Sequence, residues 1–246
     1  MKRMGDGMND GRGIVRCYDD FIEALLAAGF SMGGGSDDGI YSIVDWVWNE
    51  TPPYETPIAW HTGDPETDPW EWRMRVLDER DDIVYAKLFF KKSGFITKEW
   101  YPYFLSARRG GLTFDEAYDD GTISHYAKRI YDAVAENGAL ATHTIKQVAG
   151  FSRDEKASFD KALTELQMKM YITMCGKQYR SVKSAMNNNC WASTVMTTTE
   201  SFFGEAVFEE ADAISSEVAF EKIKEQILKL NPLAEEKRIN KFIFMS

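Results

Sequence analysis

The sequence predicts an α+β protein with a tryptophan-rich α+β domain, a winged helix-turn-helix domain and a long C-terminal helix. Six of the seven tryptophans lie between residues 46 and 100, among helical and β-prone segments. Between residues 122 and 203, three amphipathic segments precede two β-prone runs, which is the element order of a winged helix. A helical pattern of apolar residues then continues over residues 205–230.

Domain boundaries follow from these segments. A chain of 246 residues with 44% hydrophobic residues is long and apolar enough for two cores. The expected divisions are a flexible N-terminus at 1–13, the tryptophan-rich domain at 14–110, a linker at 111–121, the winged-helix domain at 122–203, and the C-terminal helix and tail at 204–246.

Composition excludes several classes of protein. Cys17, Cys175 and Cys190 are too few and too scattered for a disulfide framework or a zinc site, which favours the cytoplasm. No apolar run reaches the roughly 20 residues of a membrane span, and the basic N-terminus lacks the apolar stretch of a signal peptide. No sequence motif calls for a cofactor or a metal, so none is expected.

The first domain opens with a helix and a loop. "CYDDFIEALLAAGF" predicts an amphipathic helix that ends at Gly29. "SMGGGSDDG" predicts a flexible loop, and without a preceding strand or a following lysine it is weak evidence for a phosphate site. "IYSIVDWVWNE" fits either a helix or a strand, and the proline-rich and acidic residues 51–68 indicate a loop.

Regular structure is expected again after this loop. Asp68 suits the cap of a helix that starts at Pro69 and ends near Arg80. "IVYAKLFFKKSGFIT" predicts a hairpin with its turn at Lys92–Gly94. Thr97 then caps a helix in "KEWYPYFLSARR", whose start is restricted by the early proline.

The predicted winged helix has three capped helices. Thr122 caps the first, which ends at Gly138, and Thr142 caps the second, with Ile145 and Val148 facing inward. "SRDE" is a capping box for the third helix, whose inner face holds Phe159, Ala162, Leu163 and Leu166. The runs "MYITM" and "WASTVMTTTESFF" complete a hairpin with a turn at Cys175–Gly176.

Duplex DNA is the partner that this module suggests. In a winged helix the third helix enters the major groove and the wing contacts the backbone. Residues 122–200 are also the one block in which basic residues outnumber acidic ones, although the net charge of the chain is −10. The candidate DNA contacts are Arg153, Lys161 and Thr164 on the third helix and Lys177, Arg180 and Lys183 on the wing, beside three asparagines at 187–189.

Acidic neighbours weaken this face, since Asp154 and Asp160 lie close to the basic residues of the third helix. The alternative is that the wing residues are ordinary solvated loop residues. The module would then pack against another domain or subunit.

The stretch "AWHTGDPETDPWEWRMRVL" contains the second candidate site. The residues that would line a pocket there are His61, Asp64, Trp70, Trp72 and Arg73. The tryptophans form either the core of a small domain, which is the favoured interpretation, or a stacking platform for a base or ligand. His61 and the nearby carboxylates resemble a metal or acid–base site, but prolines interrupt the spacing and no second histidine lies nearby. No residue is therefore assigned as catalytic or metal-binding.

Residues 60–109 resemble the AlkZ-related family of uncharacterised bacterial proteins, which pair a tryptophan–arginine helix, a "YGK"-like strand and a hairpin with a downstream winged helix. The matching residues are Trp72–Arg73 and Tyr85–Ala86–Lys87, with alanine where the family usually has glycine. The resemblance implies kinship with DNA glycosylases similar to AlkZ, which use a Gln-x-Gln or Gln-x-Asp motif. No glutamine of this chain has glutamine or aspartate two residues later, so the motif is absent.

The long C-terminal helix is expected to pack across both domains or to form a homodimer. Three functions remain open from the sequence. The leading hypothesis is non-catalytic DNA binding, of a kind that suits a regulator. The alternatives are a divergent base-excision enzyme whose aromatic domain holds a flipped base, and a protein-interaction module that binds no nucleic acid.

Overall fold

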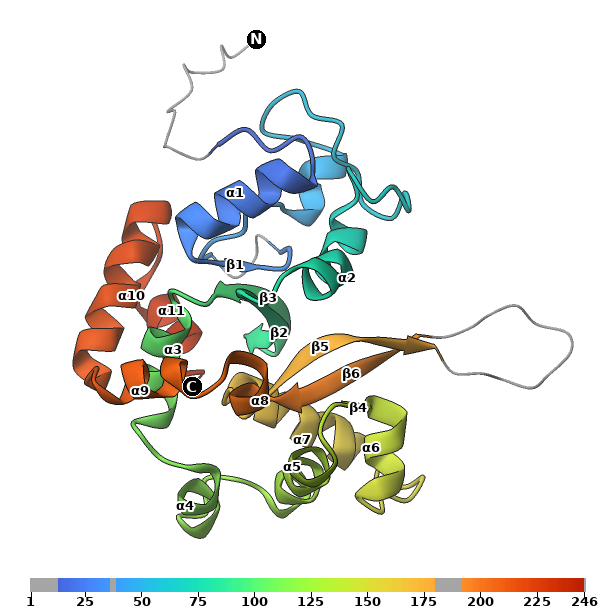
Figure 1. The fold of residues 1–246 in the computed structure, drawn as a ribbon. Coiled ribbons are helices and arrows are strands. Elements are labelled where there is room, and N and C mark those ends of the chain that lie inside the picture. Colours follow the sequence, from blue (N-terminus) through green and yellow to red (C-terminus); the bar gives the residue numbers. More distant parts are fainter. Residues whose placement is uncertain (1–12, 36–38, 180–191, 246) are drawn as a thin grey trace, which may run out of the picture.

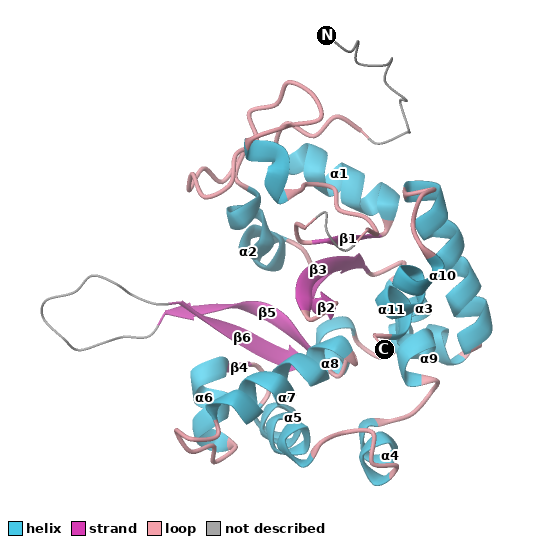
Figure 2. Ribbon diagram, turned by 180° about the vertical axis from the view of Figure 1, so that it is seen from behind, coloured by secondary structure: helices cyan, strands magenta, loops and turns pink. Residues whose placement is uncertain are grey.

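The structure is a computed structural model that describes residues 13–35, 39–179 and 192–245. It is a mixed α+β fold with two three-stranded antiparallel sheets, as the α+β prediction requires (Figure 1). Helices surround both sheets, and the hairpin of the second sheet extends away from the rest of the molecule (Figure 2). No helix within these described ranges has the length and apolar composition needed to cross a membrane.

The first sheet has the strand order β1 (Phe30–Met32), β3 (Lys92–Thr97) and β2 (Ile83–Phe89). Every residue of β2 is buried except Lys87, which shows that both faces of this strand are covered. The strand β1 directly precedes the glycine-rich loop, so the expectation that no strand precedes that loop was wrong.

The turn between β2 and β3 is at Phe90–Lys91, and not at Lys92–Gly94 as the sequence suggested. Both turn residues have positive φ angles, 50° and 64°, as a tight hairpin turn requires. Gly94 lies inside β3 instead. A Cβ atom there would lie 2.5 Å from the Phe89 ring and 2.8 Å from the Ser31 carbonyl oxygen, so this glycine permits close packing and does not make the turn.

Three helices pack around this sheet: α1 (Tyr18–Ala28), α2 (Pro69–Glu79) and α3 (Tyr101–Arg109). The first ends at Gly29, with φ 87°, and the second is capped by Asp68, both as predicted. The third begins at Tyr101, four residues after the predicted Thr97 cap, because Pro102 is tolerated only in the first turn of a helix. The ambiguous segment before the acidic loop contains a short 3-10 helix, η2 (Trp46–Asn49).

The C-terminal segment forms three helices, and so the prediction of one long helix was wrong. They are α9 (Ala206–Asp212), α10 (Ser216–Leu230) and α11 (Glu236–Phe244). Ser215 accepts a hydrogen bond from the Val218 backbone N–H and starts α10, which breaks the expected helix. Helices α9 and α10 pack on α3. The expected tail is α11, whose Phe242 ring stacks on Phe89 with centroids 3.9 Å apart.

The second sheet belongs to the region predicted as a winged helix. Its elements are α5 (His125–Asn137), β4 (Leu140–Ala141), α6 (Thr142–Val148), α7 (Lys156–Met168), β5 (Ile172–Tyr179) and β6 (Ala192–Thr198), followed by α8 (Thr199–Phe203). The strand order is β4-β6-β5. The expected linker contains a further helix, α4 (Phe114–Asp119), because Thr113 and Glu116 form a capping box.

Several caps in this region differ from the prediction. Ser124, and not Thr122, caps α5, and Thr142 is the first residue of α6 with its hydroxyl donating to the Thr194 carbonyl. Val148 was predicted to face inward but is 50% exposed, and Ile145 is the buried residue of this short helix. The expected turn at Cys175 is a β-bulge inside β5 instead, because the pairing with β6 continues beyond it.

The hydrophobic core divides into two clusters. The first contains the tryptophan-rich segment together with α9, α10 and α11, so the C-terminal helices complete the core that the N-terminal half begins. The second contains the inner faces of α4, α5, α6 and α7 and parts of β5 and β6. The two clusters meet where α7 and β5 pack against β2.

Candidate nucleic-acid interface and aromatic corner

Helix α7 has one exposed half and one covered half. Arg153, just before the helix, and Lys161 are exposed to solvent. Thr164 is half-buried, and its hydroxyl oxygen accepts a hydrogen bond of 3.4 Å from the Lys87 ammonium of β2. One turn further on, the Gln167 side-chain oxygen accepts a 3.0 Å hydrogen bond from the Lys87 backbone N–H. The C-terminal half of α7 is therefore docked on β2.

Of the two acidic neighbours of this face, Asp154 is exposed and forms no ion pair within the described residues, whereas Asp160 is partly neutralised. Asp160 lies 3.8 Å from the Lys146 ammonium of α6. Glu155 forms an ion pair of 3.0 Å with Arg129 and accepts a hydrogen bond from the Ser152 backbone N–H, and these bonds lower the pKa of Glu155. Neither Arg153 nor Lys161 forms an ion pair with a carboxylate in the part of the chain that the structure describes.

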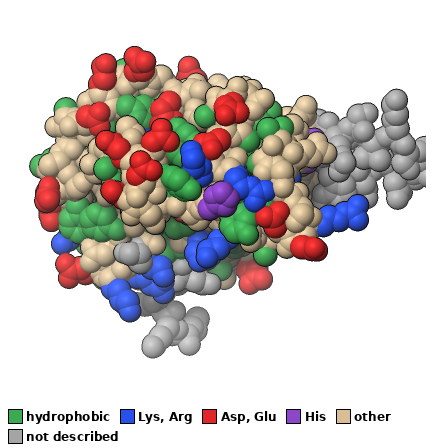
Figure 3. All heavy atoms as spheres, turned by 90° about the horizontal axis from the view of Figure 1, so that it is seen from below, with side chains coloured by type: hydrophobic (Ala, Val, Ile, Leu, Met, Phe, Trp, Pro, Cys, Tyr) green, Lys and Arg blue, Asp and Glu red, His purple; other side chains and the backbone are tan. Residues whose placement is uncertain are grey.

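The residues predicted to form a wing begin in the hairpin of β5 and β6. Lys177 is exposed and pairs in register with Thr194, near the end of the hairpin that leads into the connecting loop (Figure 1). Arg180, Lys183 and the three asparagines at 187–189 lie outside the described residues. Seen from below, acidic side chains predominate at the upper left of the molecule, whereas lysines and arginines gather along its centre and lower part (Figure 3).

A second cluster, the aromatic corner, consists of Trp46, Trp60, His61, Trp70 and Arg73. The Trp46 and Trp60 rings stack with centroids 3.9 Å apart, and His61 lies 4.9 Å from the Trp70 ring. The Arg73 guanidinium covers one face of Trp70 at 3.3 Å. Trp46 and Trp70 stay 42% and 37% exposed, so the corner presents aromatic surface to solvent.

The buried carboxylate of Asp68 holds this corner together. One of its oxygens accepts hydrogen bonds from the His61 and Trp70 backbone N–H groups at 3.0 and 2.8 Å, and the other accepts one from Gly63 at 2.9 Å. Asp68 is fully buried, and His61 has a φ of 63°. The carboxylate therefore acts as a clamp that fixes the loop in this strained conformation and also caps α2.

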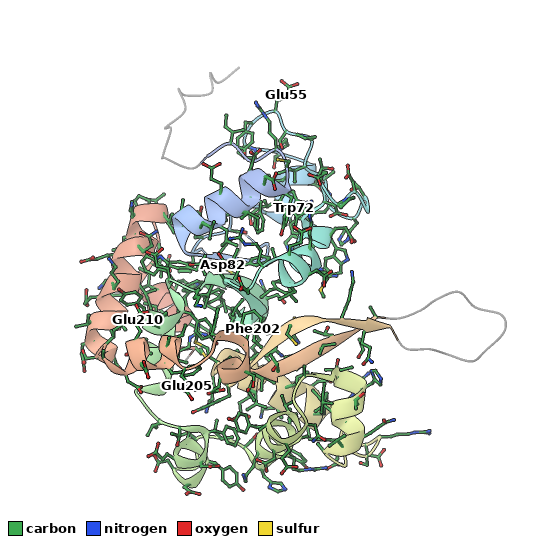
Figure 4. All side chains as sticks on the ribbon, viewed as in Figure 1. Glu55, Trp72, Asp82, Phe202, Glu205 and Glu210 are labelled. Atoms are coloured by element: carbon green, nitrogen blue, oxygen red, sulfur yellow. The ribbon has the colours of Figure 1, made fainter. Side chains whose placement is uncertain are left out.

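Trp72 does not belong to the exposed corner. It lies where α1 and α2 meet (Figure 4), with its ring stacked on Phe21 at 5.1 Å and edge-on to Tyr18 at 6.3 Å. It is 1% exposed and is thus a core residue, as the favoured interpretation of the tryptophans predicts for at least one of them. The cavity between the corner and Trp72 has a volume of only about 30 Å³. Ligand pockets are usually ten times larger or more.

The acidic loop is held by hydrogen bonds within the loop itself. The Asp64 carboxylate accepts hydrogen bonds from the Glu66 backbone N–H and the Thr67 hydroxyl, both at 2.9 Å, and these bonds lower the pKa of Asp64. Asp64 is exposed, whereas Asp68 is buried, so the two carboxylates do not act as a pair. Across the described residues, no three His, Cys, Asp or Glu side chains come together as metal ligands would.

Sequence reasoning missed the role of Lys87. It was noted only as part of the "YAK" strand, but its backbone and ammonium both bind α7. The one signal available was its position: a lysine in the middle of an otherwise continuous apolar strand needs a polar partner.

The comparisons with known proteins identify a family and nothing narrower. No curated protein and no solved structure matches the sequence. Residues 15–244 match the family described as AlkZ related. That match spans both core clusters and nearly the whole chain, and therefore this protein belongs to the AlkZ-related family.

Proposed function

We propose that this protein binds duplex DNA without catalysis, through a winged helix formed by α5, α6, α7 and the three strands β4, β5 and β6. The element order and the strand order β4-β6-β5 are those expected of three helices closed by a hairpin wing. Membership of the AlkZ-related family supports a DNA-related origin. The missing Gln-x-Gln or Gln-x-Asp motif favours binding over base excision.

The observation that carries the proposal is the division of α7 into a docked half and a free half. In helix-turn-helix proteins the N-terminal residues of the recognition helix contact the base edges. Here the docked half holds Thr164 and Gln167, and the free half begins beside Arg153. The N-terminal part of α7 can therefore enter a major groove. Thr164 is not included among the proposed DNA contacts, because its hydroxyl binds Lys87.

The charges on this surface suit contacts with phosphates more than contacts with bases. Arg153, Lys161 and Lys177 are exposed and have no ion-pair partner among the described residues. Each phosphate contact adds about 0.9 to the slope of log affinity against log salt. We therefore expect binding that is strongly salt-dependent and only modestly dependent on base sequence.

The test is fluorescence anisotropy with labelled duplex DNA at about 50 and about 200 mM salt. The variant Arg153→Ala/Lys161→Ala/Lys177→Ala should bind at least tenfold more weakly at the lower salt and lower the salt slope by about 2 to 3. These three side chains are exposed, so the fold should persist, and circular dichroism checks that it does.

A matched control removes the same charge elsewhere. Lys98, Lys229 and Lys237 are exposed and lie on the side of the first core cluster. Their triple alanine variant should bind like the unmodified protein. Equal losses in both triple variants, or no binding to any duplex at the lower salt, would contradict the proposal.

A further inference from the structure

A groove lies where the two core clusters meet, between the β2–β3 turn, α7 and the end of α11. We call it the lysine groove. Its volume is about 570 Å³, within the range of small-molecule sites. Its lining residues are Lys87, Lys91, Lys161, Thr164, Glu165, Met168, Lys169, Phe244 and Met245.

The groove carries an excess of positive charge. Lys87, Lys91 and Lys161 form no ion pair with any carboxylate in the described ranges, and the ammonium of Lys87 is bound only to the Thr164 hydroxyl. Glu165 is the one acidic side chain among the described residues that line the groove, and it accepts hydrogen bonds from the Ser124 backbone N–H and hydroxyl at 3.1 and 2.7 Å. Its ion-pair partner is Lys169, at 3.9 Å, so the charges of Lys87, Lys91 and Lys161 remain in excess.

Lys169 has a structural role and is not free for a ligand. Its ammonium donates to the Thr122 carbonyl oxygen and lies 3.9 Å from Glu165. Burial lowers the pKa of Lys169, as expected for an ammonium withdrawn from water. The unpaired charge of the groove thus comes from the other three lysines.

Helix dipoles do not explain why these lysines gather. The C-terminal ends of α7 and α11 both reach the groove, and carbonyl groups at helix ends attract cations. However, the Arg108 guanidinium already donates to the carbonyl oxygens of Met168, Phe242 and Ile243, at 2.9, 3.0 and 2.9 Å. Three carbonyl groups at the ends of these two helices therefore already have a cationic partner.

The wall of the groove is apolar. Met168 is nearly buried, Met245 is partly buried, and Phe244 is 40% exposed. A DNA phosphate would gain nothing from this wall, since the nucleic-acid backbone is polar. A molecule with an apolar body would bury surface against it, at about 25 cal/mol for each Å² removed from water.

We propose that the lysine groove binds a small organic anion, in which an apolar body packs on Met168, Phe244 and Met245 and an anionic group meets Lys87, Lys91 and Lys161. Such a ligand contacts β2 and α11 of the first cluster and α7 of the second, so it bridges the two clusters. The inference does not depend on DNA binding, because its test contains no DNA.

The experiment compares two fluorescent probes with the same aromatic body. Anilinonaphthalene sulfonate carries an anionic group, and phenylnaphthylamine is neutral. We expect the sulfonate to bind at one site and the neutral probe to bind at least tenfold more weakly. Lys87→Ala/Lys91→Ala should weaken sulfonate binding about tenfold, since each lost charge removes an attraction in a partly desolvated site.

Two further measurements locate the probe and control for charge. Methionine methyl resonances, assigned with Met168→Leu and Met245→Leu, should shift on addition of the sulfonate. Lys98→Ala/Lys229→Ala makes the same charge change away from the groove and should leave the affinity unchanged. Absence of saturable binding, equal affinity for the neutral probe, or binding that moves neither methionine signal overturns the proposal.

Discussion

At the scale of single residues, Asp68 decides how the aromatic corner is built. Its buried carboxylate accepts three backbone hydrogen bonds, from His61, Gly63 and Trp70. Asp68→Ala should lower the free energy of unfolding by about 2 to 4 kcal/mol, because it leaves three part-buried N–H groups without their acceptor and removes the cap of α2. Urea unfolding followed by tryptophan fluorescence measures the change.

Asp64 provides the matched control for that substitution. Its carboxylate also accepts hydrogen bonds, from Glu66 and Thr67, but it is exposed, so Asp64→Ala should cost well under about 1 kcal/mol. Asp68→Asn should give an intermediate loss. The amide oxygen can still accept a hydrogen bond, but the amide nitrogen replaces the second acceptor and cannot accept from a backbone N–H group. Similar losses for the Asp64 and Asp68 variants would show that the clamp is unimportant.

The sequence predicted the helix cap at Asp68 but not the clamp. A cap is a local pattern, because the acceptor and the donor of Trp70 are two residues apart. The bonds to His61 and Gly63 depend on how a loop folds back, and no periodicity encodes that path. For the same reason the sequence suggested one acidic site at His61, Asp64 and Asp68. In the structure Asp64 is exposed to solvent and Asp68 is buried, so the two carboxylates have different surroundings.

At the scale of elements, the β2–β3 turn is a place where a non-optimal residue is tolerated. Lys91 has a φ of 64° in a two-residue turn that favours glycine at this position. Lys91→Gly should therefore raise the free energy of unfolding by about 0.5 to 1 kcal/mol, since relief of backbone strain exceeds the entropy that glycine adds to the unfolded chain. Thermal unfolding measures this gain.

A glycine elsewhere on the surface should have the opposite effect. Lys98 is exposed and has no positive φ, so Lys98→Gly should destabilise the protein slightly. If Lys91→Gly were also destabilising, contacts of the Lys91 side chain would outweigh the turn. The sequence suggested the wrong turn because Gly94 is the stronger turn signal, and the close contact of Gly94 with Phe89 is visible only when the strands are paired.

At the scale of the whole molecule, local patterns predicted most elements, whereas the assembly depends on contacts between distant segments. Phe242 completes a core that begins with Phe30 and Phe89, and Gln167 binds a strand 80 residues earlier. Such pairings leave no periodic signal, so the predicted tail turned out to be the core helix α11. The exposed half of α7 was equally unpredictable, because it depends on where β2 docks.

Arg108 is the residue through which this assembly can be tested. Its guanidinium donates to carbonyl oxygens at the ends of α7 and α11 and forms no ion pair with a described carboxylate. Burial lowers the pKa of Arg108, yet an arginine keeps its proton at neutral pH, so the three bonds persist. Arg108→Met keeps much of the volume but leaves three carbonyl groups without their donor.

We expect Arg108→Met to lower the free energy of unfolding by about 3 kcal/mol or more, since each unsatisfied buried carbonyl costs about 1 kcal/mol or more. Arg153→Met makes the same chemical change at an exposed position and should stay within about 0.5 kcal/mol of the unmodified protein. Arg108→Lys keeps the charge with fewer donors and should lie between them. Urea unfolding of the three variants gives the comparison, and equal stability of the two methionine variants would mean that α7 and α11 are joined by packing alone.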